Sequence, residues 1–379
     1  MTPAELAAAP ELNGVLLDIN AAPLPQQQFD ALQTLIPIVS GSLWAASEGP
    51  MRQIRDVIGD RLISVVAKET EEDEQIQAQE RKKQAGFGYG DVAPLDNGAW
   101  IQVLGDEVRQ HERHSVPGYK AQVLGLVIGR DFSASDQFTF GFAVGYEHAK
   151  VMERNSGGSV LEIDRFQGSV YGSHHFEHSS FYFNWIVTVA ENDYDGHRHI
   201  VVPPFAGLPF VRIANADFDA FEFDAYLEAG YVWQKRNFRA IPKILFNYAY
   251  LNPESYFEQD AFGLDLFVQY DNMHVLPLGA GFKLDYKNEF TNVLVVPEAH
   301  AYVFYNIVND KEMASALFTA GGFPFLSQGA TPPPWSLELG LGLNVHSFTN
   351  TLISLHYDYV TKADYHRHQA FIKVRHEWA

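Results

Sequence analysis

The chain has 379 residues, of which 46% are hydrophobic and 14% aromatic, and its formal net charge is −20. This length allows one large core or barrel, while the acidic balance argues against a nucleic-acid partner, because phosphate binding requires clustered Lys and Arg. The sequence contains no cysteine, which excludes a disulfide framework, a thiolate metal site and a cysteine nucleophile.

The N-terminal part of the sequence is predicted to be helical over residues 28–69, with breaks at Pro37 and at the Gly49-Pro50 pair. Within residues 51–69, apolar side chains recur every three or four positions, which indicates an amphipathic helix. A charged connector follows at residues 68–84. The charged positions of the helix include Arg52, Arg55, Asp56 and Arg61.

Two features of the sequence bear on its location. No apolar run approaches the roughly 18 residues that a membrane-spanning helix needs, which excludes a helical membrane protein. The first basic residue is Arg52, so the sequence shows no positively charged segment followed by an apolar one, as a signal peptide would. We expect either that the chain continues from a longer precursor or that it stays inside the cell, and the first is favoured.

From Gly98 to the C-terminus, apolar residues recur at every second position, which is the pattern of β-strands. In the stretch WSLELGLGLNVH, residues 335–346, a polar or small residue follows each bulky apolar one. Short and long connections alternate between such segments. The pattern predicts about twelve strands, near residues 98–109, 118–132, 136–150, 160–174, 180–195, 211–233, 237–251, 274–286, 293–306, 335–346, 350–360 and 366–378.

Long alternating strands, an even strand count and alternating connection lengths predict an outer-membrane β-barrel with lipid outside and a polar lumen inside. The sheet must close, because every backbone group in hydrocarbon needs an internal partner. A soluble β-sandwich or lipocalin-like barrel is the alternative, although such folds turn their apolar face inward. Pro242, Pro277 and Pro297 conflict with a regular strand register where they lie.

The barrel prediction assigns side chains to its two faces. Tryptophans are expected at the membrane interfaces, where an aromatic ring with a polar edge is favoured. This aromatic girdle comprises Trp100, Trp185, Trp233, Trp335 and Trp378. The side chains expected to face the lumen are Asp224, Glu228, Lys243, Lys283, Asp285, Glu298, Glu338, Lys373 and Arg375.

The ordered series of segments resembles the autotransporter β-domain, the translocator domain of type V secretion. The resemblance spans nearly the whole chain, and no single segment is specific by itself. The segments that carry it are, in order, IGDRL at 58–62, GAWIQVLGD at 98–106, GYKAQVLGLVIGRDF at 118–132, FTFGFAVGYEHAKV at 138–151, FDAYLEAGYVW at 223–233, PEAHAYVFYN at 297–306, ALFTAGGFPFLSQGA at 316–330 and AFIKVRHEWA at 370–379.

The resemblance implies an all-β membrane protein, a twelve-stranded antiparallel transmembrane β-barrel with an N-terminal α-helix threading or plugging the lumen. Residues 1–97 would form a helical lead-in, a pore helix at 51–69 and a charged linker, and residues 98–379 would form the barrel. The arginines of the pore helix would face lumenal carboxylates such as Glu228, Glu298 and Glu338. Packing of this helix on the periplasmic side is the alternative.

The resemblance also implies a function. The barrel would lie in the outer membrane of a Gram-negative bacterium, in contact with its lipid, and would export or anchor a covalently linked passenger that is not visible in this sequence. Its last strand would carry the signal read by the barrel-assembly machinery. Ala379 departs from the aromatic residue that usually ends the family. The signal positions share one face of the strand and are Ala370, Ile372, Val374 and Trp378.

Some members of this family release their passenger through an asparagine on the pore helix. No asparagine lies between Gln28 and Asp96, so we expect no self-cleavage by this route. We also expect no enzyme activity, cofactor or metal site, because no catalytic motif is present and the histidine clusters have no shared ligand spacing. These clusters are expected in solvated loops, at His174, His175 and His178, at His197 and His199, and at His366 and His368.

Two other functions remain open on the sequence. The first is an outer-membrane channel or porin without secretion. The second is a surface adhesin that acts through its loops, especially those near residues 191–212, 252–273 and 307–334.

Overall fold

The structure is a computed structural model of the chain and describes residues 3–22, 24–45, 97–135, 137–176, 179–202, 210–290, 293–347 and 351–378. Two α-helices and a 3₁₀ turn precede the strands: α1 Pro3–Asn20, α2 Pro25–Gln33 and η1 Ser42–Trp44. The long strands are β1 Asn97–Gln110, β2 Tyr119–Ser135, β3 Phe138–Glu153, β4 Val160–His175, β5 Phe181–Val202, β6 Phe210–Tyr231, β8 Phe238–Pro253, β11 Met273–Tyr286, β13 Val293–Asn309, β16 Trp335–Ser347, β17 Thr351–Lys362 and β18 Tyr365–Trp378. The shorter elements are β7 Trp233–Lys235, β9 Tyr256–Phe257, η2 Phe262–Leu264, β10 Leu266–Tyr270, β12 Asn288–Glu289, β14 Met313–Phe318 and β15 Phe325–Gln328.

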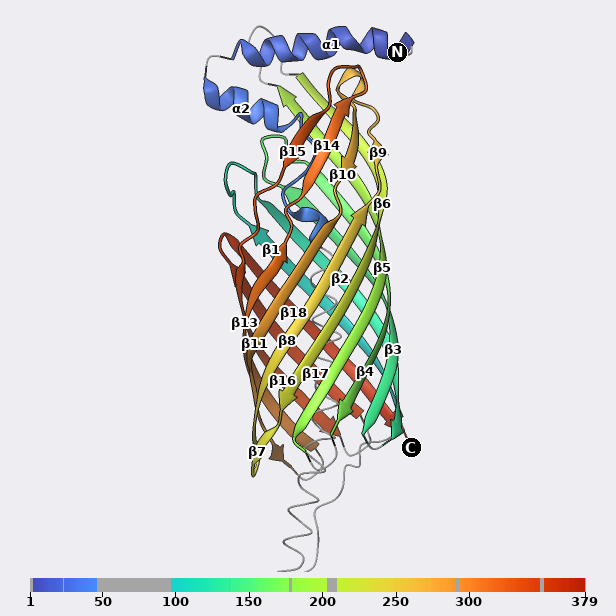
Figure 1. Cartoon of the computed structure of the whole chain (residues 1–379), viewed down its shortest axis with the longest axis vertical. Helices are drawn as coiled ribbons and strands as arrows, with labels where there is room; N and C mark the ends of the chain where they lie inside the picture. The colour runs from blue at the N-terminus through green and yellow to red at the C-terminus, as the bar shows by residue number, and fades with distance from the viewer. Residues whose placement is uncertain are drawn as a thin grey trace, which may run out of the picture.

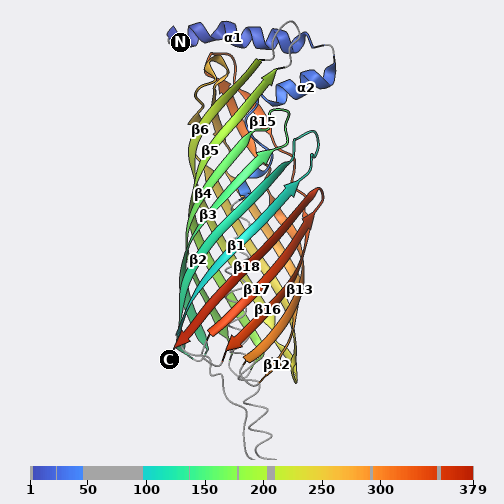
Figure 2. The same cartoon turned by 180° about the vertical axis from the view of Figure 1, so that it is seen from behind.

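The long strands pair antiparallel with their neighbours and close into a barrel (Figures 1 and 2). β1 pairs with β2 on one side and with β18 on the other, so the first and last strands complete the ring. β8 pairs with both β6 and β11, which joins the two halves of the wall. The prediction of a twelve-stranded antiparallel barrel is confirmed.

The two faces of the strands have opposite character. On β16, the apolar side chains of Leu339, Leu341 and Leu343 are exposed, whereas Glu338 is fully buried. A soluble β-fold would bury the leucines and expose the glutamate. This inverted pattern is that of a barrel with lipid outside and a polar interior. Among the described residues, no helix combines the length and the apolar composition needed to cross a membrane.

The prolines inside the strands coincide with irregular pairing in two of three cases. The register between β11 and β13 shifts between Leu276 and Pro277. Pro242 lies on β8 opposite the break between β6 and β7, where its missing N–H removes one hydrogen bond of the ladder. Pro297 is accommodated within β13, across from Leu343.

The wall is taller on one side of the barrel. β5 and β6 have 22 residues each and extend well beyond the ends of β16, β17 and β18 (Figure 2). A separate four-stranded sheet, in the order β15-β14-β10-β9, prolongs the wall at this end. It joins β6 through a bridge between Asn215 and Gln259. Residues 252–273 and 307–334, which the sequence suggested as loops, therefore contain this second sheet, and residues 191–202 are strand.

The N-terminal region differs from the helix expected over residues 28–69. α2 ends at Gln33, and only the single turn η1 is helical in residues 34–45, which pass down into the barrel (Figure 1). Residues 46–96, and with them the predicted helix at 51–69, lie outside the described part of the chain. α1 and α2 lie over the end that carries the second sheet, while the C-terminus lies at the opposite end, where β1 also begins.

Candidate functional site: the barrel lumen and its plug

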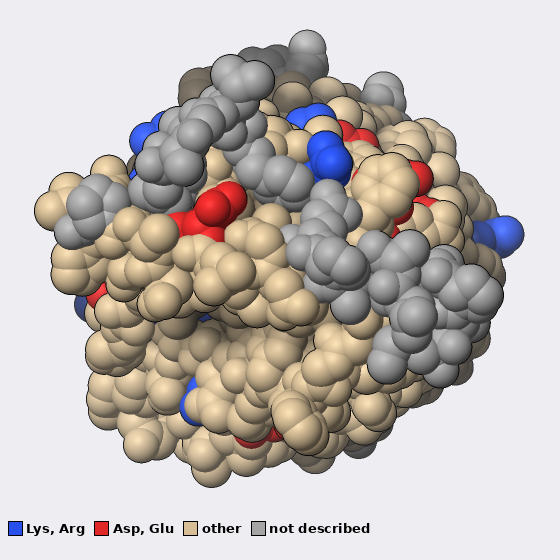
Figure 3. Space-filling view, turned by 90° about the horizontal axis from the view of Figure 1, so that it is seen from above, with Lys and Arg blue, Asp and Glu red and all other residues tan. Residues whose placement is uncertain are grey.

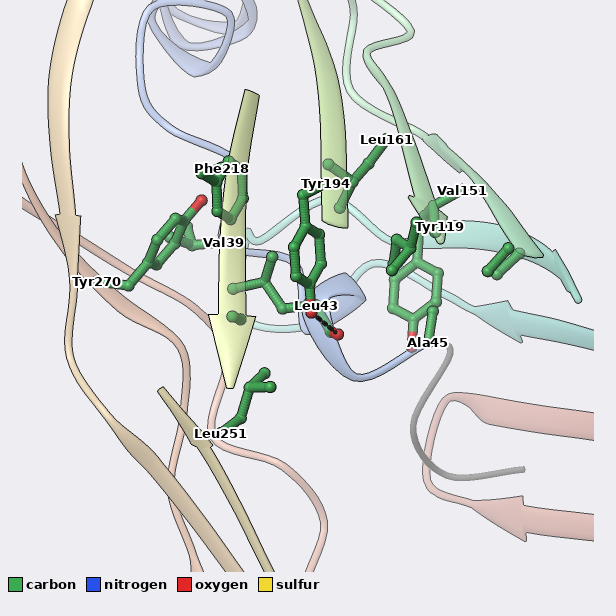
Figure 4. Packing of buried hydrophobic residues seen from close by; sticks show 14 of the residues in the cluster. Val39, Leu43, Ala45, Tyr119, Val151, Leu161, Tyr194, Phe218, Leu251 and Tyr270 are labelled. Atoms are coloured by element: carbon green, nitrogen blue, oxygen red, sulfur yellow. Dashed lines mark hydrogen bonds between the residues drawn. The ribbon is translucent and has the colours of Figure 1, made fainter. Parts of the chain in front are cut away.

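Residues 34–45 fill the upper lumen, and we call them the lumenal plug. Val39, Leu43 and Ala45 are buried in an apolar cluster formed by side chains of the surrounding strands (Figure 4). The wall side chains that surround them include Tyr119, Val151, Leu161, Tyr194, Phe218, Leu251 and Tyr270. Because apolar side chains replace a polar lining at this level, the plug packs here as a segment packs in a protein core.

Wall side chains also donate hydrogen bonds to carbonyl oxygens of the lumenal plug. The Arg198 Nη1 group donates to the Thr34 carbonyl at 2.8 Å, and the Tyr270 hydroxyl donates to the Ile38 carbonyl at 2.7 Å. The Gln110 amide donates to the Ser40 carbonyl at 2.7 Å, and the Tyr194 hydroxyl donates to the Leu43 carbonyl at 2.9 Å. A main chain without regular secondary structure is thereby satisfied inside a protein.

Two buried carboxylates accept hydrogen bonds from the same segment. Glu312 accepts the Gly41 N–H at 2.8 Å and the Leu43 N–H at 3.0 Å, and Glu153 accepts the Ser40 hydroxyl at 2.6 Å. Glu312 lies between β13 and β14, outside the membrane-spanning strands. Burial raises its pKa from 4.5 to about 7, although the two N–H donors act in the opposite direction.

Above the plug, α1 and α2 cover the opening through a second apolar cluster. Leu12, Val15 and Ile19 of α1 pack there with Leu35 and with residues of β5 and η2. Arg198 lies directly beneath this cap, ion-paired with Glu258 and donating to the Leu264 carbonyl at 2.9 Å. One buried arginine therefore binds both the plug and the η2 turn against which the cap packs. Beside the plug, a cavity of about 160 Å³ lies next to Trp44.

The lumen below the plug is polar and charged. Arg165 of β4 binds both carboxylate oxygens of Glu222 at 3.1 Å, and its guanidinium lies 3.7 Å from Asp224 and 3.9 Å from Glu147. All four side chains are buried. Asn192 of β5 donates to Glu222 at 3.0 Å, so one network joins four neighbouring strands from β3 to β6. Charged groups with little access to bulk water need such partners.

The nine side chains that the sequence assigned to the lumen are all buried, but they form separate groups. Glu228 receives the Tyr182 hydroxyl at 2.7 Å and lies 3.3 Å from Lys243. Lys283 and Glu298 are 2.7 Å apart. The other assigned side chains pair elsewhere: Asp285 with Arg239, Arg375 with Asp131, and Glu338 with His300, while Asp224 joins the Arg165 network and Lys373 is buried on β18.

The sequence reasoning missed several members of this lining, including Arg165, Glu222 and the ion pair between Arg367 and Asp106. Glu222 lies between Phe221 and Phe223, which face away from the lumen, so strand parity could have identified it. The histidine clusters were expected in loops. The histidines of these clusters that the structure describes lie instead on strands β4, β5 and β18. Among the described residues, no group of three or more His, Cys, Asp or Glu is arranged to hold a metal ion.

The tryptophans divide between the two faces. Trp335 and Trp233 are 59% and 46% exposed, and Trp185 and Trp378 are half-buried. Trp100 is only 2% exposed and donates its indole N–H to the Tyr171 hydroxyl at 2.9 Å, so its assignment to the outer girdle was wrong. The reason is strand parity, which places Trp100 on the inner face with Gln102, and Gly129 leaves space for its ring, since a Cβ there would lie 2.3 Å from the indole.

The remaining assigned residues lie at the two ends of the sequence. Ala370, Ile372 and Val374 are exposed on the outer face of β18, and the guanidinium of Arg130 lies 5.3 Å from the ring centre of Trp378. The expected pore-helix side chains lie outside the described residues and are Arg52, Arg55, Asp56 and Arg61.

A closed barrel with an apolar outer face, a charged lumen and its own N-terminal segment inside is an outer-membrane β-barrel of the plugged kind. A family model described as the autotransporter β-domain matches residues 99–358, and the chain belongs to this family. It is accordingly a translocator barrel of the outer membrane of a Gram-negative bacterium.

Relatives and solved structures are similar to this chain over most of its length. Outer membrane protein B of Rickettsia prowazekii (strain Madrid E) is 24% identical over 295 residues, which cover 76% of this chain and 18% of that protein. Outer membrane protein A of Rickettsia conorii (strain ATCC VR-613 / Malish 7) is 22% identical over 281 residues, which cover 73% of this chain and 14% of that protein. The chain thus spans about a fifth or less of the length of these relatives.

The translocator domain of the autotransporter NalP from Neisseria meningitidis superposes with a TM-score of 0.59 at 13% identity, covering 83% of this chain and 97% of that one. The β-domain of the Bordetella autotransporter Brka superposes with a TM-score of 0.53 at 15% identity, and the match covers 75% of this chain and 100% of that one. These likenesses show the fold.

Proposed function

We propose that this barrel exports a passenger joined to its N-terminal side and then anchors that passenger at the cell surface. The observation that carries the proposal is the course of the chain. α1 and α2 lie outside one end of the barrel, residues 34–45 are buried in the lumen, and β1 begins at the opposite end (Figure 1). In outer-membrane barrels, the end with the short turns faces the periplasm. A passenger preceding α1 would therefore lie outside the cell.

The lumen suits transport of an unfolded polypeptide for a physical reason. An extended chain exposes unpaired N–H and C=O groups, which hydrocarbon cannot satisfy. The charged and hydroxyl side chains of the lower lumen offer partners for these groups, while the apolar upper lumen accepts residues 34–45. The plug would then close the exit once the passenger is outside, which also disfavours a role as an open porin.

We also propose that residues 51–69 form the pore helix and that residues 1–97 and 98–379 are the two functional parts of the chain. Acidic side chains outnumber basic ones among the buried residues of the described part. Arg52, Arg55 and Arg61 would complement this excess, because buried charges require partners. The exposed face of β18 would be read by the barrel-assembly machinery, and the apolar outer wall would contact lipid. The barrel would work without catalysis.

The location of the N-terminus tests this proposal. A short epitope placed before α1 in the full chain should bind an antibody on intact bacteria, because the helices lie at the surface end. An epitope placed after Trp378 should be detected only after the outer membrane is permeabilised. An N-terminal epitope that also required permeabilisation would contradict export through this barrel.

A second candidate function is adhesion by the barrel itself. Three phenylalanines at the surface end are exposed: Phe323 at 91%, Phe262 at 65% and Phe257 at 64%. Seen from above, the described surface is largely uncharged (Figure 3). Exposed apolar side chains on β9, on η2 and between β14 and β15 favour protein contact. Replacing all three by serine should abolish attachment to host surfaces if the barrel adheres, without changing epitope display.

A further inference from the structure

Besides packing on its side chains, the upper lumen binds the main chain of the lumenal plug. Five wall side chains make six hydrogen bonds to backbone groups between Thr34 and Leu43. Four of these side chains donate to carbonyl oxygens, and the fifth, Glu312, accepts two N–H groups. The five side chains are Gln110, Tyr194, Arg198, Tyr270 and Glu312. Every residue other than proline carries such a donor and such an acceptor on its main chain.

Two of the five side chains are held in place by partners outside the plug. Arg198 is ion-paired with Glu258, and Tyr194 stacks on Phe218 with ring centres 4.8 Å apart and planes 2° from parallel. The five side chains come from β1, β5, β10 and the segment between β13 and β14, so they surround the plug. A binding group held before its ligand arrives loses little entropy on binding. The arrangement is therefore that of a prepared binding site.

We propose that these five side chains form a backbone clamp, a binding site for the main chain of polypeptides of varied sequence. The inference rests on the proposed export function, because an exported passenger crosses the barrel at the level that residues 34–45 occupy. The clamp would hold each passing stretch through its peptide groups. Hydrogen bonds to peptide groups do not distinguish one sequence from another, whereas a side-chain pocket does.

The plug differs from other passing stretches in its side chains. Val39, Leu43 and Ala45 fill the apolar cluster, and Gly41 adopts a φ of +94°, which most residues with a side chain disfavour. These features add packing to the main-chain contacts. The clamp thus supplies general binding, and the side chains of residues 39–45 determine where the chain stops.

A single reporter thiol can measure how tightly the clamp holds. The chain contains no cysteine, so Ser42→Cys, at a fully buried and nearly isosteric position, introduces a unique one. The rate of its reaction with a membrane-impermeant maleimide is measured on the full chain in outer-membrane vesicles. In this background, Glu312→Ala should accelerate labelling by at least about tenfold, because two buried N–H groups lose their acceptor.

Matched variants separate the clamp from ordinary packing. Glu254→Ala removes an exposed carboxylate near β9 and should leave the rate unchanged. The double variant Ile36→Ala and Ile38→Ala changes half-buried side chains of the segment but keeps its main chain, and it should alter the rate by less than about threefold. If this variant accelerates labelling as much as Glu312→Ala does, side chains hold the plug and the clamp is refuted.

Folding and export are read separately. Heat-modifiable migration on gels reports the folded barrel, and the N-terminal epitope reports export. Should Glu312→Ala not fold, the double variant Tyr194→Phe and Tyr270→Phe removes only two hydroxyl donors and should accelerate labelling by at least about fivefold. If the N-terminal epitope is at the surface but neither wall variant changes the labelling rate, the clamp is refuted and the export function stands. A hidden epitope overturns the export function on which it rests.

Discussion

Gly41 gives the lumenal plug a backbone conformation that aims its N–H at Glu312. Its φ is +94°, and a Cβ there would meet only the ends of Gln110 and Tyr119, at 3.7 Å or more. Space is therefore available, and the cost of a side chain lies in the backbone. Gly41→Ala should destabilise the seated plug by about 1–2 kcal/mol, which would accelerate Ser42→Cys labelling about tenfold.

A second glycine provides the control for this prediction. Gly158 has a φ of +65° in the connection between β3 and β4, with no atom within 4 Å of a built Cβ. Gly158→Ala carries a similar backbone penalty away from the plug. Equal labelling of the two alanine variants would show that the effect is not local to the lumen.

Glu312 makes the stability of the plug depend on pH. Its pKa is about 7 when buried and 4.5 as the ordinary value, so the protonated form is favoured in the folded state. Stability from this group is fully present below pH 4.5 and is lost as the pH rises through 7. Labelling of Ser42→Cys, normalised to the unfolded chain, should therefore be faster at pH 8 than at pH 6.

The control for the pH dependence is Glu312→Gln, which removes the titrating group and should reduce the ratio between the two rates. Glu153, the other acid that contacts the plug, remains in this variant and accounts for any residual dependence. If the normalised labelling rates of the wild-type chain at pH 8 and pH 6 are nearly equal, ionisation of Glu312 does not destabilise the plug.

At the scale of the strands, the network around Arg165 joins β3 to β6. Arg165→Met keeps most of the volume but leaves the carboxylates of Glu147, Glu222 and Asp224 without this buried cation. Breaking a buried ion pair in this way costs about 3–5 kcal/mol. The temperature at which the folded band is lost on gels should fall clearly.

An exposed ion pair on the same strands is the comparison. Lys150 and Glu162 pair across β3 and β4, with side chains 49% and 34% exposed. Lys150→Met should cost less than about 1 kcal/mol, because solvent screens this pair. Similar losses in both variants would mean that the buried network contributes no more than a surface contact.

For the whole molecule, the N-terminal region should control conductance. Both apolar clusters of the upper barrel depend on residues of α1, α2 and the lumenal plug. In planar bilayers, the full chain should conduct poorly, and a chain starting at Asp91 should conduct strongly. A large and equal conductance from both would favour the porin.

Parts of this architecture follow from local sequence, and others do not. The alternation in residues 335–346 predicted β16, because strand geometry sends neighbouring side chains to opposite faces. Trp100 was assigned to the outer girdle because it is a tryptophan. The alternation of side chains along β1 instead places it on the same face as the buried Gln102 and Asp106. Residues 252–273 offered no long alternating run, so the short strands β9 and β10 were not predicted.

The plug shows the limit of the sequence most clearly. Residues 34–45 were expected to be helical, but Pro37 and Gly41 interrupt them, and apolar side chains on several sides are buried by the barrel wall. A segment that is buried on every side has no exposed face, so its sequence shows no amphipathic pattern. Its partners, such as Gln110, Tyr194 and Glu312, lie 70 to 271 residues away in the sequence.

By itself, the sequence determined the class of the protein: a closed antiparallel barrel of twelve strands with apolar residues outside and charged residues inside. It could do so because side-chain direction in a strand depends only on the neighbouring residues. The tertiary structure alone decided which lumenal charges pair, where the second sheet forms and how residues 34–45 are held. Those contacts join residues that are distant in the sequence, and only closure of the barrel brings them within hydrogen-bonding distance.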